Sequence, residues 1–233
     1  MEYCRIENLS VNGNSNLNRS GGGAAFGIWF DADEATSSGF IETQQLTVSA
    51  FGDGIRVGRG ASSTSCVAQN TFYASIVINC DFGVHVLGEN TDGLDLYDLQ
   101  TAFNRIADVR VEGGRNVHIH GGGDGSSSPK TLDCVYFWIA SNGGGGFSAE
   151  NLRIETKKQL FYVSSEPLTE NTDSSTVSHD QEISLVLNNV AQCEPHPQAS
   201  QVPTCVGHWA TSGHLQIDNC MFMAYDPYLR FAG

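Results

Sequence analysis

One pattern occurs three times in succession in the first half of this sequence. Each copy has an alternating apolar run, a tight turn and a second alternating run. The second runs are Gly54–Val57, Gly83–Val86 and Asp108–Val111. Their equivalent apolar positions, Ile55, Val84 and Val109, are separated by 29 and then 25 residues. This period is typical of one turn of a solenoid and is too short for a propeller blade.

The alternation within each run predicts which side chains face the interior. Side chains two residues apart point to the same side of a β-strand. We therefore expect Ile55 and Val57 inside the solenoid and Arg56 outside, with the same arrangement in the other copies. A leucine-rich repeat would need a Leu-x-x-Leu-x-Leu consensus and a following helix, which the sequence lacks. The pattern predicts an all-β solenoid of roughly eight coils.

Composition bounds the class of protein. A chain of 233 residues with 40% hydrophobic residues is expected to form one domain spanning residues 1–233. The 26 glycines and only 6 prolines favour many sharp turns over disorder. The net charge of −14 argues against a nucleic-acid-binding protein, which needs a basic face, and against binding to an anionic membrane. No apolar run is long enough to predict a membrane span.

The start of the sequence predicts how the chain is made and capped. Residues Met1–Cys4 have neither the basic nor the apolar region of a signal peptide. This favours synthesis in a reducing cytoplasm or excision from a longer polypeptide. Strand-like residues begin almost at once, and a solenoid exposes apolar surface at each end, so neighbouring chains or further segments are expected to cap it. Parallel packing of three copies would reduce that need, and we predict a homotrimer.

The second half of the sequence is less regular than the first. Polar excursions are expected near residues 164–180 and 193–205, and loops of this kind often carry the function of a rigid scaffold. The seven cysteines show no zinc-binding spacing. Cys80 and Cys220 follow strand-like residues and are interpreted as small buried side chains. Cys193 and Cys205 either form a disulfide that staples a loop or stay unpaired.

Several phrases of the sequence resemble those of a known fold. Ile6–Gly13 reads Ile-Glu-Asn-Leu-Ser-Val-Asn-Gly, residues 150–154 read Glu-Asn-Leu-Arg-Ile, and Gly-Ile-x-Val turns recur. These phrases resemble the right-handed parallel β-helix of pectate-lyase-like proteins, which include the tailspike polysaccharide depolymerases of bacteriophages. The resemblance implies a right-handed, single-stranded parallel β-helix, a polysaccharide partner, and a place on a virion tail or outside the cell. It covers nearly the whole chain, but it rests on the repeat and not on a catalytic motif.

Outward residues at equivalent positions are expected to line up along the solenoid, because neighbouring strands lie about 4.8 Å apart. Trp29, Arg56, His85 and Arg110 form such a column. An aromatic face, two guanidinium groups and an imidazole suit an extended sugar chain. We therefore predict that these four residues bind substrate. The alternative is that outward strand residues are charged only for solubility.

Aspartates near the same turns are candidate catalytic groups. Asp53, Asp81 and Asp108 fall at similar places in the turns, just before the strands that carry the outward residues Arg56, His85 and Arg110. Hydrolysis of a glycosidic bond needs two carboxyl groups, about 5 Å apart for retention or about 6.5 to 9.5 Å apart for inversion, and such aspartates would suit either. A lyase would instead need a basic residue and a way to neutralise a uronate, for which Ca²⁺ is the one candidate cofactor. The alternative is that an aspartate in a turn bonds its own backbone.

A second resemblance concerns single motifs. Asn90–Gly93 matches the Asn-Thr-Asp motif of polygalacturonases, and His120-Gly121 and Arg153–Glu155 are similar to later motifs of that family in the same order. This resemblance implies that Asp92 is catalytic and that His120 binds substrate. The chain departs from the family pattern, because the paired aspartates are reduced to Asp108 and a glutamate replaces the lysine. The Asn-Thr-Asp-Gly sequence also makes a plain turn.

Two functions from different classes follow. In the first, the protein cleaves a bacterial or other extracellular polysaccharide as a hydrolase or lyase, using carboxylates among Asp53, Asp81, Asp92 and Asp108. In the second, it is a non-catalytic module of a virion or surface appendage that binds glycan or acts as a stiff spacer. His118 and His120 lie two apart and can chelate a metal. No third ligand is evident, so no metal site is predicted.

Overall fold

The computed structural model describes residues 3–13, 26–31, 37–59, 66–87, 91–125, 135–140, 144–155, 159–163, 179–192, 206–208, 210–222 and 229–231. All regular structure in these residues is β-strand, which confirms the all-β prediction. The excursions predicted near residues 164–180 and 193–205 fall mostly or wholly outside the described residues, and strand β17 already begins at His179. Cys193 and Cys205 are outside as well.

The strands form two parallel sheets, which we call sheet A and sheet B. Sheet A has twelve strands. They are β1 (Cys4–Glu7), β2 (Ser10–Asn12), β4 (Ser37–Gly39), β5 (Ile41–Gln44), β6 (Thr47–Ser49), β8 (Cys66–Tyr73), β9 (Ile76–Ile78), β11 (Asp92–Ala102), β13 (Arg115–Asp124), β15 (Gly145–Ile154), β17 (His179–Gln192) and β19 (Ala210–Asp218).

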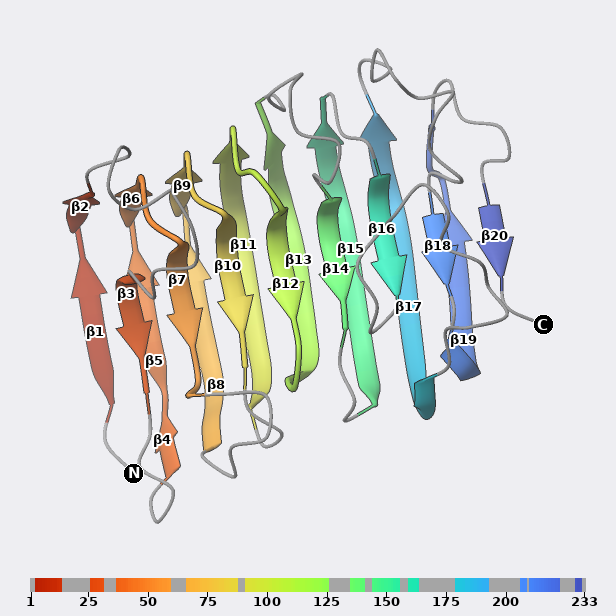
Figure 1. Cartoon of the computed structure of the whole chain (residues 1–233), viewed down its shortest axis with the longest axis horizontal. Coiled ribbons are helices and arrows are strands. Elements are labelled where there is room, and N and C mark those ends of the chain that lie inside the picture. The colour runs from red at the N-terminus through yellow and green to blue at the C-terminus, as the bar shows by residue number, and fades with distance from the viewer. Residues whose placement is uncertain are drawn as a thin grey trace.

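Sheet B has eight shorter strands. They are β3 (Phe26–Phe30), β7 (Asp53–Val57), β10 (Phe82–Val86), β12 (Ala107–Val111), β14 (Val135–Ile139), β16 (Gln159–Val163), β18 (Val206–His208) and β20 (Leu229–Phe231). The chain passes from sheet A to sheet B and back again along its whole length, and every strand pairing is parallel. Figure 1 shows the two sheets face to face, with their strands running in opposite directions.

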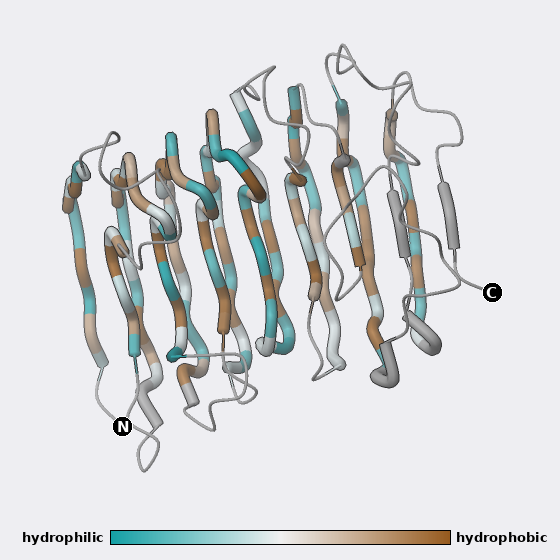
Figure 2. The backbone as a smooth tube through the Cα atoms, viewed as in Figure 1, coloured by the Kyte–Doolittle hydropathy of each residue, from teal (hydrophilic) through white to brown (hydrophobic). Residues whose placement is uncertain are grey.

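The register of sheet B confirms the alignment expected from the repeat. Ile55 lies opposite Val84, and Val84 lies opposite Val109. All three side chains are fully buried in one continuous apolar core between the sheets. Figure 2 shows the corresponding alternation of apolar and polar residues along the strands. The interior is therefore filled by residues that repeat every second position, as the alternation predicts.

The Gly of the Gly-Ile-x-Val phrase is explained by close approach of the backbone. A Cβ atom at Gly54 would lie 2.7 Å from the carbonyl oxygen of Gly83, and one at Gly83 would lie 2.5 Å from that of Asp108. Gly27 is similarly close to Gly54. A larger residue at any of these three positions would meet the backbone of the neighbouring strand, so glycine recurs at them.

Sheet A bends at a column of residues in the left-handed conformation. This column contains Asn8, Gln45, Ala74, Asp98, Gly121, Asn151, Asn189 and Asn219, whose φ angles lie between 48° and 72°. Asparagine tolerates this conformation better than most residues because its side chain bonds the local backbone. The Asn of the two Glu-Asn-Leu phrases therefore marks the bend of the sheet. The Asn189 side-chain amide also donates to Asn151 Oδ1 at 2.8 Å, which ties two bends together.

The remaining expectations on the scaffold are met in part. Cys80 is fully buried, as predicted, whereas Cys220 is only half-buried, and both are free thiols. Within the described residues no helix is long and apolar enough to cross a membrane.

Candidate functional site

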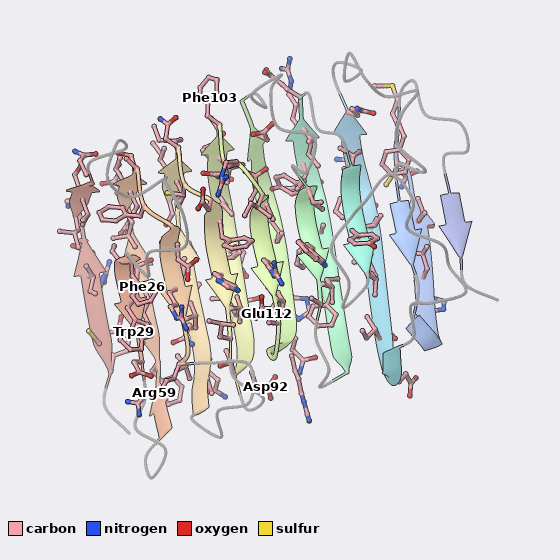
Figure 3. The ribbon with its side chains drawn as sticks, in the orientation of Figure 1. Phe26, Trp29, Arg59, Asp92, Phe103 and Glu112 are labelled. Atoms are coloured by element: carbon pink, nitrogen blue, oxygen red, sulfur yellow. The ribbon has the colours of Figure 1, made fainter. Side chains whose placement is uncertain are left out.

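The predicted column of outward residues forms one row across sheet B. Trp29 lies opposite Arg56, Arg56 opposite His85, His85 opposite Arg110, and Arg110 opposite Trp138. A second row at the beginning of the strands contains Phe26, Asp53 and Phe82. We call these residues, with Glu112, the sheet B cluster. Figure 3 labels Phe26 and Trp29 on β3 and Glu112 several strands farther along.

Cationic and aromatic side chains alternate within the sheet B cluster. The Arg56 guanidinium carbon lies 4.5 Å from the ring centroid of Phe26 and 5.8 Å from that of Trp29. The Arg110 guanidinium is held between Phe82 and Trp138, at 5.0 and 4.0 Å from their centroids. Cations are attracted to the negative face of an aromatic ring, most strongly where water is excluded. The rings therefore hold both guanidinium groups in place.

Two carboxylates link the three cationic side chains. Asp53 Oδ2 lies 3.2 Å from an Arg56 guanidinium nitrogen and 3.1 Å from His85 Nδ1. Glu112 Oε1 lies 3.2 Å from His85 Nε2 and 2.6 Å from an Arg110 guanidinium nitrogen. His85 is thus bracketed by two carboxylates, with only 7% of its surface exposed. The network is a compact set of ion pairs at the surface of sheet B.

The charges of the network support each other. Burial lowers the pKa of His85. Asp53 and then Glu112 raise it by a larger total amount, so the pKa of His85 lies above its ordinary value. Burial raises the pKa of Glu112. His85 and the two arginines lower it by a larger total amount, so Glu112 stays ionised. Burial lowers the pKa of Arg110, and Glu112 and Asp53 partly offset this. The site therefore favours an imidazolium between two carboxylates.

The face of sheet B is open at one end and covered at the other. Trp29 on β3 is 44% exposed, and its indole nitrogen donates to the Gly58 carbonyl at 2.9 Å. Toward the C-terminus both faces of β14 and β16 are buried, including the outward side chains of Trp138 and Tyr162. On the strands between these ends, the outward side chains of Arg56 and Arg110 are half-buried and that of His85 is buried. A ligand on this face would therefore contact mainly Trp29 and the exposed parts of the two arginines.

The other predicted catalytic aspartates do not join Asp53. The register places Asp53 opposite Phe82 and Phe82 opposite Ala107, so Asp81 lies one residue before this position and Asp108 one residue after it. The expectation that the three aspartates occupy similar places is therefore wrong. Asp81 pairs with Arg105 at 2.7 Å, and the buried Asp108 accepts a 2.8 Å hydrogen bond from Asn104.

Asp92 and His120 lie on sheet A, away from this cluster. Exposed Asp92 begins β11 and accepts a 2.7 Å hydrogen bond from Asn116. Asp92 pairs with Arg115 on β13, and His120 lies five residues after Arg115 on that strand. Asp92 and His120 are therefore not neighbours. Asp108 is on sheet B. The residues that resemble polygalacturonase motifs are therefore spread over two sheets, since the repeat separates them.

Four members of the sheet B cluster were not predicted from the sequence. Phe26 and Phe82 begin their strands in register with Asp53, a position that alternation alone assigns to the interior. Glu112 lies just beyond the end of β12. Trp138 lies opposite Arg110 on the next strand of sheet B. It could have been predicted by extending the row of outward residues by one strand. Within the described residues no group of three or more His, Cys, Asp or Glu side chains is arranged to hold a metal ion.

Comparison with models of protein families, with characterised proteins and with solved structures finds no match for this chain.

Proposed function

We propose that this protein is a right-handed parallel β-helix that binds a polysaccharide along the outward face of sheet B. One observation carries the proposal: the half-exposed ring of Trp29 stands at the open end of a row of cationic and aromatic side chains. A sugar ring can pack on an aromatic face while its hydroxyl groups bond to neighbouring charged groups. From Trp29 the row continues across β7, β10 and β12 to Arg110, which suits a ligand that extends across several strands.

The right-handed β-helix is supported by the path of the chain. Successive strands alternate between two sheets, and each pairs in parallel with a strand of an adjacent turn. A connection between parallel strands of one sheet is right-handed in the great majority of proteins, because strand twist favours that hand. The resemblance of the Glu-Asn-Leu and Gly-Ile-x-Val phrases to pectate-lyase-like proteins agrees with this hand.

Binding without cleavage is the function that the charges favour. A glycoside hydrolase of the common type needs one carboxyl group that is protonated and reaches the bond to be broken. Asp53 and Glu112 are each held by two cationic side chains, and the pKa of Glu112 is lowered. His85 is too deeply buried to transfer a proton to a sugar. The network is thus better arranged to hold charges in place than to exchange protons.

Cleavage is the second candidate function, and one observation favours it. Asp53 and Glu112 lie on opposite sides of a single imidazole, so two carboxylates share a site with aromatic neighbours. If the network opens when ligand binds, this pair is the one to test for hydrolysis, and Arg56, His85 and Arg110 are those to test for a lyase. A uronate substrate would call for Ca²⁺ as cofactor.

The location and the oligomeric state of the protein are inferred from the same resemblance. We infer a homotrimer on a virion tail or outside the cell, with a polysaccharide as partner and no nucleic acid. The net charge of −14 supports the last point, because a phosphate backbone would be repelled.

The experiment measures retention of the protein in gels that contain bacterial capsular, O-antigen, plant or algal polysaccharides. The wild type is compared with Trp29→Ala and with Phe103→Ala. Phe103 is 47% exposed and belongs to the sheet A side, so it is a matched control. We expect Trp29→Ala to weaken binding about threefold to tenfold, because stacking on one ring is lost, and Phe103→Ala to leave binding unchanged.

The same samples distinguish the two candidate functions. Retention without new reducing ends or new ultraviolet absorbance supports binding alone. New reducing ends that disappear in Glu112→Gln would establish hydrolysis, and unsaturated products would establish a lyase. Equal weakening by both aromatic variants, or no retention by any polysaccharide, would overturn the sheet B site.

A further inference from the structure

His85 lies at the centre of the sheet B cluster and connects its charged side chains. Asp53 Oδ2 is 3.1 Å from His85 Nδ1, and Glu112 Oε1 is 3.2 Å from His85 Nε2. Asp53 also pairs with Arg56 on β7, and Glu112 also pairs with Arg110 on β12. Both arginines are therefore held by carboxylates that share one imidazole. When this imidazole is protonated, the charges alternate in sign from Arg56 to Arg110.

The arrangement around His85 requires a proton on each ring nitrogen. A protonated imidazole has two N–H donors, whereas a neutral imidazole has one donor and one acceptor. Loss of the proton would leave one carboxylate oxygen facing a nitrogen lone pair at 3.1 or 3.2 Å. Because His85 is buried, bulk water does not screen this repulsion. One of the two carboxylates therefore has to move when the proton leaves.

A carboxylate that leaves His85 has a second donor within reach on its own arginine. The Nε atoms of Arg56 and Arg110 are buried, and neither has a hydrogen-bond partner within the described residues. Nε and a terminal nitrogen of an arginine match the two oxygens of a carboxylate. Asp53 or Glu112 can therefore turn from His85 to a two-point pair with its arginine. The guanidinium of that arginine then shifts relative to the aromatic rings around it.

His120 on sheet A shows the same contacts without burial. Its two nitrogens lie 2.6 Å from Glu150 and 3.3 Å from Asp95, and these carboxylates are 38% and 37% exposed. Water can replace a hydrogen bond that is lost at such an exposed site. The two carboxylates at His85 are only 9% and 24% exposed. His120 is therefore a matched control for an effect that depends on burial.

The charged groups around His85 agree with the geometry. They are Asp53 and Arg56 on β7, Arg110 on β12, and Glu112 just beyond the end of β12. Burial lowers the pKa of His85, and the two carboxylates together raise it above the ordinary value of 6.5. The proton is therefore lost on the alkaline side of pH 6.5.

We propose that His85 is a proton switch for the sheet B cluster, which fixes both arginines on their aromatic rings while protonated and releases one of them when the proton is lost. A polysaccharide on this face contacts mainly Trp29 and the exposed parts of the two arginines. Movement of one arginine alters this surface, so binding weakens as the pH rises. The link to binding rests on the proposed function, whereas the rearrangement itself does not.

The first measurement follows the indole N–H signals of the whole protein by NMR between pH 6 and pH 9. The chain has only three tryptophans, and Trp29 and Trp138 each face an arginine of the cluster. We expect at least one of these two signals to titrate with a midpoint above pH 6.5. The titration should be absent in His85→Gln and present in His120→Gln. Constant signals in the wild type, or the same titration in His85→Gln, would overturn the switch.

Glu112→Gln tests the number of donors that the site requires. The new amide can donate to His85 Nε2, so a neutral imidazole satisfies both of its neighbours in this variant. We expect the midpoint of the indole titration to fall by about one pH unit or more, because one of the two charges that favour protonation is lost. An unchanged midpoint would overturn the role of the paired carboxylates.

The second measurement is retention at pH 6 and at pH 9 in gels that contain the same polysaccharides as above. The wild type and His120→Gln should bind about threefold more weakly or worse at pH 9, and His85→Gln should bind equally at both pH values. Equal retention of the wild type at both pH values, or equal weakening in His85→Gln, would overturn the link between the switch and binding.

The two measurements separate this proposal from the proposed function. An indole titration without retention at either pH would refute polysaccharide binding and support the switch. Retention without an indole titration would support polysaccharide binding and refute the switch.

Discussion

The two sheets carry similar residue types on their outward faces but use them differently. On sheet B the rows alternate cations with rings, so each guanidinium lies against aromatic faces and the carboxylates are nearly buried. On sheet A similar rings follow each other in one row and stack, and the carboxylates beside them are partly exposed. Neighbours at about 4.8 Å are imposed by the parallel strands. The two sheets differ in which side chain comes next in the row. On sheet A one ring lies beside another ring, whereas on sheet B a cationic group lies beside a ring.

The backbones of the two sheets differ as well. Among the described residues, the non-glycine residues with positive φ all belong to strands of sheet A or lie next to them, whereas the strands of sheet B, of three to five residues, contain none. A left-handed residue bends a strand and turns the following side chains. Sheet A can therefore curve around the core, while sheet B stays straight enough to align one long row of side chains.

Removing Asp53 should have the largest effect on stability. The Asp53→Ala change leaves the buried charges of Arg56 and His85 without their shared carboxylate, at a cost of about 3 kcal/mol in the free energy of unfolding. Urea unfolding followed by circular dichroism measures it. The control is Glu7→Gln, whose exposed pair with Arg5 contributes less than about 1 kcal/mol. Equal losses in the two variants would show that the sheet B network is no stronger than a surface pair.

The free energy of unfolding of the protein should depend on pH through His85 in the sheet B cluster. Its pKa in the folded protein is above the ordinary value of 6.5, so its protonated form stabilises the fold. This stabilisation is complete below pH 6.5 and is lost as the pH rises through the folded pKa, with a slope of at most about 1.4 kcal/mol per pH unit. Glu112 acts in the opposite range, because its lowered pKa gives stability that is lost only in acid.

The measurement compares unfolding of the wild type and His85→Gln between pH 6 and pH 9. The wild type should lose stability more steeply over this range than the variant, since only the wild type releases this proton. Parallel curves would contradict the raised pKa of His85. The groups that face His85 in this test are Asp53, Glu112, Arg56 and Arg110.

The bend of sheet A should be relieved by glycine at Ala74. Ala74 is exposed and has a φ of 48°, a conformation that costs an ordinary residue about 1 kcal/mol or more and costs glycine little. We expect Ala74→Gly to raise the free energy of unfolding by up to about 1 kcal/mol. Ala102→Gly, on the same sheet but without positive φ, should instead lower it by about 0.5 to 1 kcal/mol. Thermal unfolding of both variants checks the sign, and destabilisation by both would contradict strain at the bend.

Removing Asp95 should have the smallest effect on stability. Its side chain is 37% exposed, and its contact with His120 is long at 3.3 Å, so Asp95→Asn should cost less than about 1 kcal/mol. Measured beside Asp53→Ala in the same urea series, it gives the contrast between the sheets directly. A loss as large as that of Asp53→Ala would contradict the contrast between the two sheets.

The row on sheet B was predictable, whereas most of its partners were not. Period-two alternation around the recurring apolar positions aligns Trp29, Arg56, His85 and Arg110 without any knowledge of the third dimension, although the repeats differ in length. The same reasoning misplaced Asp81 and Asp108. The three aspartates Asp53, Asp81 and Asp108 precede the aligned residues Ile55, Val84 and Val109 by two, three and one residues, so they do not share one register position. Glu112 lies after its strand, where alternation has no predictive value.

The sequence by itself determined the class of fold and the direction of its side chains. Local spacing is enough for this, because a strand has only two faces and each repeat adds a strand in the same register. The tertiary structure decided which charges meet. Whether Asp53 reaches His85, or Glu150 reaches His120, depends on the stacking of strands that are about thirty residues apart in the chain. Pairing, burial and therefore pKa arise only when those strands lie side by side, since electrostatic and ring contacts act over a few ångströms.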